Sequence, residues 1–351
     1  MRSAIAIIGG GAAGYFAAIA AREARAGRGG AVKLFEATAK SLAKVSISGG
    51  GRCNVTHHCF DIPRFLESYP RGSRELRSVF SRFQARDTVD WFAKRGVELK
   101  AEADGRMFPV TDSSQTIIDC LTDAARQAEV RVEHRVRVKR IQRDGEGFRL
   151  EVRSEGLIKS VSADRLILAT GGGDSGFRLA AELGHRIVAP VPSLFTFKVE
   201  DARLSGLEGI SVPSARIELV LAEDERFRAD GPLLVTHWGL SGPAILRLSA
   251  WAARELHRTD YRGTLVINWL GIPLPEIERH LLECKAEESK KSVVSVAPGV
   301  PRRLWQRLLE AAAIDPQKRW QEVARKELST LCELLGRSRM EVSGKGVFKE
   351  E

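Results

Sequence analysis

Hydrophobic residues at the start of the chain follow a strand–helix–strand pattern. The apolar run Ala4 to Ile8 has the length of a buried strand, and the Ala-rich run Ala12 to Ala26 is typical of a helix. A second apolar run, AVKLFE, ends in Glu36. This order predicts a βαβ unit, the building block of an α/β domain with a parallel sheet.

The middle of the chain alternates between helical and strand-like periodicity. Helices are predicted over three segments: Ser73 to Gln84, Asp87 to Lys94, and Ser114 to Gln127. Gly96 is expected to end the second, and Asp112 or Ser113 to cap the third. Alternating residues on either side of Asp144 to Gly147 predict strands around a Gly-rich hairpin. The run RLILATGGG is interpreted as a buried strand that leads into a second Gly-rich turn.

The pattern changes near Pro190. Strand-like runs dominate as far as residue 275, and residues 276–337 have apolar positions at helical spacing. Within the strand-rich part, SGPAILRLSAWAARELH predicts a helix with Ser241 as its N-cap and Pro243 in its first turn. Trp305 and Trp320 are interpreted as core residues.

The glycines between the first strand and helix have the spacing GxGxxG. Gly9 permits a tight turn, Gly11 lets a pyrophosphate approach the backbone, and Gly14 lets helix and strand pack closely. The N–H groups of the helix start, including those of Ala12 and Ala13, suit phosphate oxygens. Glu36, 22 residues after Gly14, would accept hydrogen bonds from a ribose and would repel a 2′-phosphate. The segment therefore predicts a dinucleotide site that disfavours NADP.

The same segment has a competing interpretation. Arg2 followed by the uncharged run Ser3 to Ala21 could be a signal peptide or a short membrane span. Its centre, GGGAAG, is a poor apolar helix, and the downstream strand and Glu36 would then be coincidental. We favour the dinucleotide site.

A second loop of three glycines, Gly49 to Gly51, follows the βαβ unit. Ser48 precedes it, and Arg52, Cys53 and Asn54 follow it. Consecutive glycines do not form the interior of a stable element, so a flexible backbone segment is expected. The adjacent polar donors favour a loop that wraps a phosphate or a flat ring over a plain surface loop.

Composition narrows the class of protein. The chain has 351 residues, 43% of them hydrophobic and 28% charged, which is ordinary for a soluble globular protein, and its length predicts two domains. A cytoplasmic location without membrane association is the default expectation. The five cysteines are scattered and form no CxxC pair, so we predict neither a disulfide framework nor a metal site.

The charge balance is basic. The formal net charge is +10 and the isoelectric point about 9.6. Such a protein can bind dinucleotide phosphates, nucleic acid or acidic partners. The stretches Arg71 to Arg86 and Arg131 to Arg143 are dense in arginine, but we interpret both as solvated faces of ordinary elements. A nucleic-acid partner is therefore not the favoured prediction.

Several motifs occur in a fixed order along nearly the whole chain. They are ISGGGRCNVT (Ile47 to Thr56), FPVTD (Phe108 to Asp112), LATGG (Leu168 to Gly172), LGH (Leu183 to His185) and THWGLSGPAILRLSAW (Thr236 to Trp251). Together they resemble the BaiN-like flavoproteins, often labelled NAD(P)/FAD-dependent oxidoreductases. ISGGGRCN and THxGLSGP are specific to this group, whereas GxGxxG is not.

The resemblance implies an α/β fold: an FAD-binding, three-layer Rossmann-like domain with an inserted β-rich plus helical domain. The implied division is 1–190 for the FAD-binding domain (with a β-meander at about 130–163), 191–275 for the β-rich insert, 276–338 for the helical insert, and 339–351 for the start of a truncated return to the Rossmann domain. It also implies FAD as the cofactor. The implied FAD-binding residues are Gly9, Gly11, Ala12, Ala13, Gly14, Glu36, Ser48, Gly49, Gly50, Gly51, Arg52, Cys53, Asn54, Val138, Thr170 and Gly171.

The chain departs from the family pattern in two places. Only Gly173 to Gly176 separate LATGG from the next helix, where relatives carry a longer loop. The chain also ends at VSGKGVFKEE, where family members continue into the last Rossmann strand and a turn beside the flavin. We therefore expect a fragment or weakened flavin binding, with an unpaired sheet edge and exposed apolar faces.

With FAD bound, hydride chemistry comes from the cofactor. Relatives imply transfer to or from an unidentified small molecule, one option being reduction of an enone-type double bond with NAD(P)H as a transient donor. The catalytic residue is not assigned; His237 is a weak candidate for the proton donor and is more readily explained as a structural turn residue. His57 and His58 are interpreted as a solvated pair. The sequence does not define the oligomeric state.

Two alternatives belong to other functional classes. The first is a flavin-dependent RNA-modifying enzyme, suggested by the high isoelectric point and by a general likeness to tRNA-modifying flavoproteins; it predicts RNA binding that weakens steeply with salt. The second is a non-catalytic scaffold or fragment, which the early chain end favours and the intact glycine motifs oppose.

Overall fold

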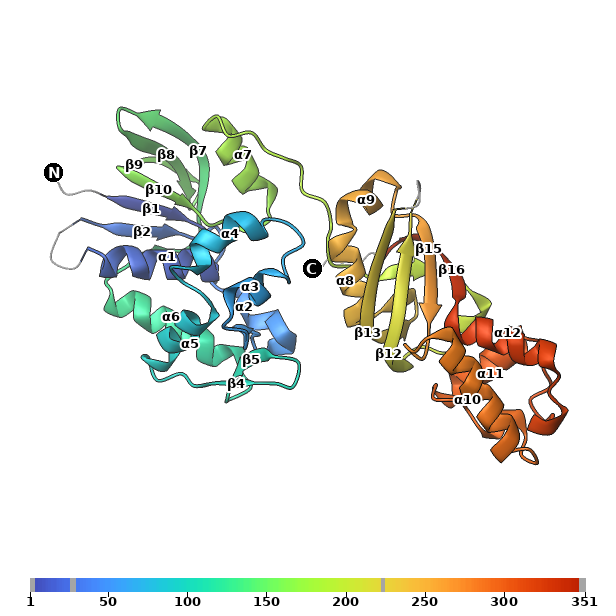
Figure 1. Ribbon diagram of the computed structural model, residues 1–351. Coiled ribbons are helices and arrows are strands. Elements are labelled where there is room, and N and C mark those ends of the chain that lie inside the picture. Colours follow the sequence, from blue (N-terminus) through green and yellow to red (C-terminus); the bar gives the residue numbers. More distant parts are fainter. Residues whose placement is uncertain (1–3, 26–29, 222–224, 347–351) are drawn as a thin grey trace. The chain divides into compact units, whose positions relative to one another are not determined.

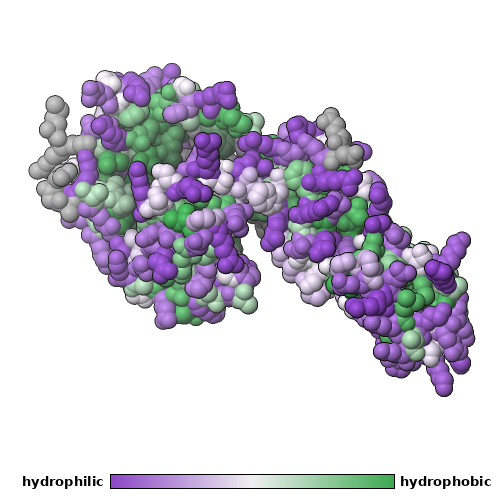
Figure 2. All heavy atoms as spheres, viewed as in Figure 1, coloured by the Kyte–Doolittle hydropathy of each residue, from purple (hydrophilic) through white to green (hydrophobic). Residues whose placement is uncertain are grey.

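The computed structural model describes residues 4–25, 30–221 and 225–346. The chain forms two compact units, Met1–Val188 (unit 1) and Ala189–Glu351 (unit 2), which are considered separately (Figure 1). Hydrophilic side chains cover most of the visible face of each unit (Figure 2). Among the described residues, no helix has both the length and the apolar character needed to cross a membrane.

Unit 1 is built on a four-stranded parallel sheet with the strand order β10–β1–β2–β6. Its strands are β1 (Ile5–Ile8), β2 (Val32–Phe35), β6 (Arg131–Glu133) and β10 (Arg165–Leu168). Ile7 lies between Leu34 and Ile167 in register. Helix α1 (Ala12–Glu23) connects β1 and β2, as the sequence predicts; Ala26, the expected helix end, lies outside the described residues.

Two other layers cover the faces of this sheet. On one side, α1 and α6 (Ser114–Gln127) pack through Ile19, Leu34 and Leu121. On the other, the antiparallel meander β7 (Val136–Asp144), β8 (Gly147–Ser154) and β9 (Leu157–Ala163) packs with α7 (Asp174–Glu182). The three-layer α/β class predicted from the sequence is confirmed, and Ser113 caps α6 by accepting from the Gln115 N–H.

The prediction that one strand is buried is wrong. The RLIL segment, β10, was expected to be buried, but its residues are alternately exposed and half-buried. The reason is its position at the sheet edge: within the described chain, β10 pairs only with β1.

The segment between β2 and α6 holds the glycine loop and a small antiparallel sheet. Its elements are α2 (Ala43–Ile47), the 3₁₀ turn η1 (Ser48–Gly51), β3 (Thr56–His57), α3 (Ile62–Leu66), α4 (Ser73–Phe80), α5 (Ala85–Ala93), β4 (Leu99–Ala101) and β5 (Arg106–Pro109). The sheet order is β3–β5–β4. Helix α4 ends four residues earlier than the predicted Gln84.

Unit 2 contains a closed barrel with the order β11–β14–β13–β12–β15–β16. Its elements are β11 (Phe197–Val199), η2 (Ala202–Leu204), β12 (Ser211–Val220), β13 (Arg226–Thr236), β14 (Gly239–Ser241), α8 (Pro243–Trp251), α9 (Ala253–Arg258), β15 (Gly263–Asn268), α10 (Leu274–Glu287), η4 (Val293–Ser295), α11 (Arg302–Ala311), η5 (Trp320–Glu322), α12 (Arg325–Gly336) and β16 (Ser338–Lys345). One hydrophobic core joins barrel and helices, and it includes the predicted core residues Trp305 and Trp320.

Two local predictions in unit 2 need correction. Residues 339–345 were assigned to the Rossmann domain, but they belong to β16, which pairs with β15 and β11 in the barrel. Alternate residues of β16, such as Met340 and Val342, are buried in the barrel core, which fixes the strand there. Ser241 lies in β14, and Gly242 with φ +96° is the N-cap of α8. The rest of the four-part domain division stays a prediction; residues 347–351 lie outside the described chain.

Candidate functional site

The turn between β1 and α1 leaves one of its glycines open to a ligand. A Cβ on Gly14 would lie 1.8 Å from the Gly9 carbonyl oxygen, and one on Gly9 would lie 2.3 Å from that of Ala169. A Cβ on Gly11 would have no heavy atom within 4 Å. Gly9 and Gly14 are therefore required by the fold itself, whereas the space at Gly11 is free to accept another molecule.

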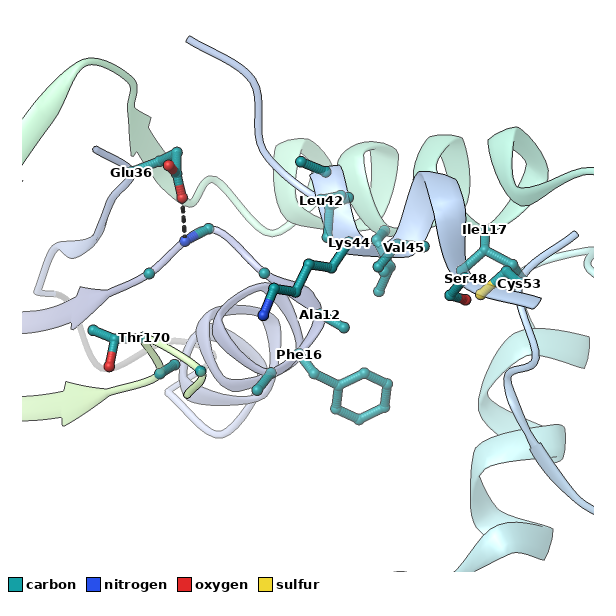
Figure 3. Close-up of a pocket in the computed structure, with 18 of the residues that line it drawn as sticks. Ala12, Phe16, Glu36, Leu42, Lys44, Val45, Ser48, Cys53, Ile117 and Thr170 are labelled. Carbon is teal, nitrogen blue, oxygen red and sulfur yellow. Dashed lines mark hydrogen bonds between the residues drawn. The ribbon is translucent and has the colours of Figure 1, made fainter. Parts of the chain in front are cut away.

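The same turn presents hydrogen-bond donors. Helix α1 has no side-chain cap, so its first N–H groups are available. Glu36 holds the turn in place: its Oε2 accepts from the Gly10 N–H at 2.8 Å (Figure 3). Its Oε1 accepts from the N–H and the hydroxyl of Thr38, both at 2.7 Å. A capless helix start beside an open glycine fits a pyrophosphate.

A cavity of about 1080 Å³ in unit 1, here called the unit 1 pocket, begins at this turn. Glu36 lies at one end, and Ser48 and Cys53 lie at the other (Figure 3). Apolar side chains line much of the space between and beyond them: Phe16, Val45, Val55, Phe83, Phe92, Ile117 and Leu121. This volume exceeds the range of ordinary small-ligand pockets, so it suits a long ligand with polar and flat apolar parts.

The glycine loop adopts a backbone that requires glycine. Gly49, Gly50 and Gly51 all have positive φ, at 58°, 70° and 83°. A Cβ on Gly49 would approach the Asn54 N at 2.8 Å. Cys53 also has a positive φ (63°) and is buried. Burial raises the pKa of the Cys53 thiol, so it stays protonated at neutral pH and is no thiolate nucleophile.

The structure gathers many of the predicted cofactor-binding residues around one cavity. The pocket lining includes Gly9, Gly11, Ala12, Ala13, Glu36, Ser48, Cys53, Asn54, Thr170 and Gly171. Other predicted residues lie elsewhere: Gly14 beneath the turn, Gly49 to Gly51 and Arg52 in the loop beside it, and Val138 buried in β7. His237 is exposed in unit 2, in the hairpin between β13 and β14. The FAD-binding role of each residue stays a prediction.

Sequence analysis missed several lining residues. Lys44 extends from α2 across the pocket toward α1 (Figure 3), and it places a cation near the turn between β1 and α1. Phe16 and Phe83 form an edge-to-face pair, with ring centroids 5.4 Å apart. The sequence gives no local indication that these residues line the pocket, because a lysine before a glycine loop and two phenylalanines far apart in the chain are both common.

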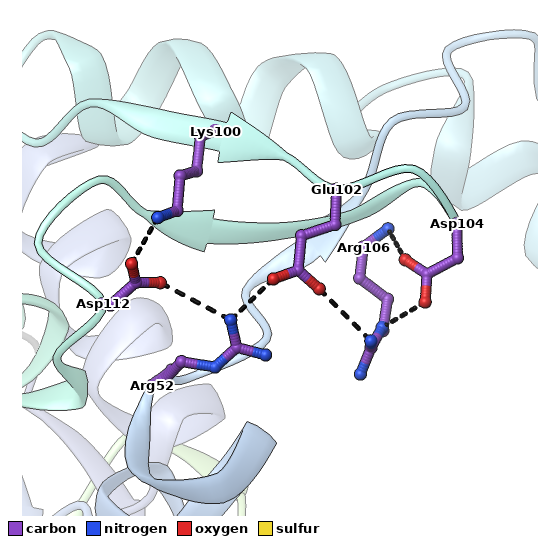
Figure 4. A network of polar contacts seen from close by, with 6 residues as sticks. All are labelled: Arg52, Lys100, Glu102, Asp104, Arg106 and Asp112. Atoms are coloured by element: carbon purple, nitrogen blue, oxygen red, sulfur yellow. Dashed lines mark hydrogen bonds and ion pairs between the residues drawn. The ribbon is translucent and has the colours of Figure 1, made fainter.

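The side chain of Arg52, a predicted cofactor contact, has several protein partners in the structure. Its Nη1 lies 2.6 Å from Glu102 Oε1 and 3.5 Å from Asp112 Oδ1 (Figure 4). Its guanidinium also lies over the Phe108 ring, 4.0 Å from the centroid. Lys100 bonds Asp112 as well. These contacts attach the glycine loop to the β4–β5 hairpin, so Arg52 helps to hold the loop in position.

This network should weaken in acid. The Lys100 ammonium is the main cause that lowers the pKa of Asp112, and the Arg106 backbone N–H is the main cause for Asp104. A lowered folded-state pKa stabilises the hairpin above about pH 4, and this contribution is lost as the pH falls through the folded-state values.

We therefore expect hydrogen-exchange protection of the β4–β5 amides to decrease below about pH 4. Asp112→Asn should have lower protection at neutral pH and a flatter pH dependence. Asp123→Asn, which removes an exposed carboxylate on α6, is the control. An identical pH dependence in wild type and Asp112→Asn would contradict this role of the network.

Comparison with known proteins identifies a family and several relatives of this chain. The family model for the HI0933-like protein Rossmann domain matches residues 3–293. A 3-dehydro-bile acid delta(4,6)-reductase from Clostridium scindens is 28% identical over 327 residues, which cover 88% of this chain and 75% of the relative. A ribosomal RNA dihydrouridine synthase from Escherichia coli is 31% identical over 322 residues, which cover 88% of this chain and 74% of the relative.

Among solved structures, the 3-ketosteroid-delta4-(5alpha)-dehydrogenase from Rhodococcus jostii is similar with a TM-score of 0.46 and 16% identity. The match covers 98% of this chain and 83% of that one. The family match spans most of the chain and agrees with the resemblance seen in the sequence motifs. The chain belongs to the HI0933-like family of Rossmann-domain proteins, and its assignment as an FAD-dependent oxidoreductase is confirmed at the level of that family.

Proposed function

We propose that this protein reduces a carbon–carbon double bond conjugated to a carbonyl, with FAD bound in the unit 1 pocket. The observation that carries the proposal is the open Gly11 beside the uncapped start of α1, at one end of a pocket with a long apolar lining. When bound, FAD supplies hydride transfer. The overall reaction adds a hydride to one alkene carbon and a proton to the other, and NAD(P)H is oxidised to NAD(P)⁺.

The chain's own residues hold and shape the cofactor site. The N–H groups of Gly11, Ala12 and Ala13 bind pyrophosphate oxygens, and the Lys44 ammonium balances their charge. Glu36 keeps the turn closed and faces the ribose. Ser48 and Asn54 line the far end of the pocket, where they would contact the ribityl chain. The apolar side chains exclude water, which strengthens each polar contact in the pocket.

The names of the two relatives indicate substrates with the same kind of reactive bond. A 3-dehydro-bile acid with Δ4,6 unsaturation has a ketone conjugated to its double bonds, and the C5=C6 bond of uridine is conjugated to the C4 carbonyl. Both are electron-poor alkenes that accept hydride at the carbon remote from the carbonyl. This supports the reaction class for the present chain and leaves a choice between a small molecule and an RNA base.

The test is stopped-flow reoxidation of the flavin. The protein is loaded with FAD, reduced anaerobically by NADH or NADPH, and mixed with a 3-oxo-Δ4,6 steroid. We expect reoxidation much faster than with the saturated ketone, and a product whose mass is greater by two hydrogens. If the steroid, ribosomal RNA and uridine all leave the reduced flavin unchanged, the reaction class is wrong and the scaffold alternative is favoured.

A second candidate is the same reduction on a uracil base of RNA. It is favoured by the 31% identity to the ribosomal RNA dihydrouridine synthase and by the net charge of +10. It predicts RNA binding whose affinity falls steeply with salt, and reoxidation by RNA but not by the steroid. RNA binding that does not respond to salt would contradict this candidate.

A further inference from the structure

The segment around α4 carries a basic surface that the dinucleotide site does not require. We infer that Arg74, Arg77, Arg82, Val79 and Phe83, here called the α4 surface, bind the phosphate backbone of single-stranded RNA and place a base at the unit 1 pocket. The inference rests on the RNA candidate above. It names the surface that would hold such a substrate.

Helix α4 lies at the surface of unit 1, and none of its residues is fully buried. It packs on α3 through an aromatic cluster in which the Phe80 ring lies 5.2 Å from that of Phe65 and 5.5 Å from that of Tyr69. Val79 is nevertheless 54% exposed, and Phe83, just beyond the helix, is 40% exposed. This segment therefore presents apolar side chains as well as arginines at the surface.

The arginines of this surface lack carboxylate partners. Between Arg71 and Arg86 there are five arginines, and Glu75 is the one acidic residue. Within residues 4–25, 30–221 and 225–346, the side chains of Arg74, Arg77 and Arg82 make no hydrogen bond or ion pair, although all three are exposed.

Other arginines of unit 1 show the contrast. Arg95 bonds Glu23 at 2.6 Å, and Arg22 bonds Glu129 at 2.6 Å. On a chain whose net charge is +10, guanidinium groups that have no partner among the described residues concentrate positive potential on the short segment 74–82. Phosphates are the ligands that such groups bind best, because each guanidinium can donate two parallel hydrogen bonds.

One residue of the α4 surface, Phe83, also lines the unit 1 pocket. Its ring remains partly exposed, and it packs edge-to-face on Phe16 at the start of α1. A strand bound through its phosphates along α4 would therefore have a base within reach of an exposed aromatic ring. Arginine for phosphates and an aromatic ring for bases is the usual combination in single-strand recognition.

A second basic surface, whose arginines also have no side-chain partner in the described part of the chain, provides a matched control. Arg137 and Arg153 face each other across β7 and β8, and Arg140 lies on the same strand as Arg137. All three are exposed, and none lines the unit 1 pocket. Replacing them removes the same charge from unit 1 without changing α4.

The experiment compares R74Q/R77Q/R82Q with R137Q/R140Q/R153Q and wild type. Fluorescence anisotropy with a fluorescein-labelled oligouridylate gives the affinity as a function of KCl concentration. For three lost phosphate contacts, we expect the α4 variant to bind roughly 100-fold more weakly at about 0.1 M salt, with a salt slope smaller by about 2. The control variant should keep nearly the wild-type slope, and equal FAD binding in all three would show that unit 1 remains folded.

The outcomes separate this inference from the function on which it rests. If wild type binds the probe and both triple variants lose affinity equally, the RNA candidate survives and the α4 surface is wrong. If wild type does not bind the probe at low salt, both fail. Sedimentation with vesicles of phosphatidylserine and phosphatidylcholine tests the other use of a basic amphipathic helix. Vesicle binding that depends on α4, with RNA binding unaffected, would overturn the inference.

Discussion

Gly11→Val is expected to abolish FAD retention while leaving unit 1 folded. A Cβ at Gly11 meets no heavy atom within 4 Å, so the protein itself tolerates the side chain. The added methyl groups would occupy the space through which a pyrophosphate reaches the N–H groups of α1. We expect the FAD dissociation constant to rise roughly 100-fold or more, which corresponds to about 2.7 kcal/mol. The measurement is flavin fluorescence titration of apoprotein, together with the flavin released per chain after purification.

Gly14→Val is the matched comparison, because this substitution should lose FAD binding by disrupting the fold of unit 1. Its Cβ would lie 1.8 Å from the Gly9 carbonyl oxygen, so helix α1 could not pack against β1. This variant should lose both FAD binding and the cooperative unfolding of unit 1, whereas Gly11→Val should keep its unfolding transition. If Gly11→Val retains FAD at wild-type occupancy, the pyrophosphate does not lie at this turn.

Trp305→Ala is expected to destabilise unit 2 by about 3–5 kcal/mol. The Trp305 side chain is completely buried, and its ring stacks on that of Trp320 with centroids 6.3 Å apart. Its Nε1 donates to the Val293 carbonyl at 2.8 Å. The substitution therefore opens a large cavity between the helices and also leaves a buried carbonyl without its donor.

Replacement of each tryptophan by phenylalanine isolates the hydrogen bond. Trp320 Nε1 is buried and has no hydrogen-bond partner in the part of the chain that the structure describes. We therefore expect Trp305→Phe to cost about 1–3 kcal/mol more than Trp320→Phe. Trp91 is in unit 1 and the other five tryptophans are in unit 2, so guanidinium unfolding followed by intrinsic fluorescence reports mainly on unit 2. Equal losses in the two phenylalanine variants would contradict a stabilising role for the Val293 bond.

The cofactor turn could be predicted because its signal is local. Gly9, Gly14 and Glu36 fall at spacings set by one turn, one helix and one strand. The contacts of Gly14 with the Gly9 carbonyl and of Glu36 with the Gly10 N–H both lie within the βαβ unit. The cap of α6 by Ser113 is local in the same sense. Such contacts follow from backbone geometry and short-range hydrogen bonds, which residue types determine directly.

What depends on distant segments could not be predicted. β10 has the hydrophobic pattern of a buried strand, yet it lies at a sheet edge, because burial depends on the presence of a neighbour strand. Residues 339–345 were assigned to the Rossmann domain, and only pairing with β15 and β11 places them in the barrel. Arg52 could pair with a phosphate or with a carboxylate, and only the folded chain brings Glu102, 50 residues away, within 2.6 Å of its Nη1.

The sequence by itself thus determined the class of the fold, the glycine turn between β1 and α1 and the family, since glycine spacing and short motifs carry that information. The tertiary structure decided which of the predicted residues line one pocket and added Lys44 and Phe83 to them. It also left Arg74, Arg77 and Arg82 without side-chain partners among the described residues. The physical reason is that side-chain partners are chosen by packing between segments far apart in the chain, and no local pattern encodes that choice.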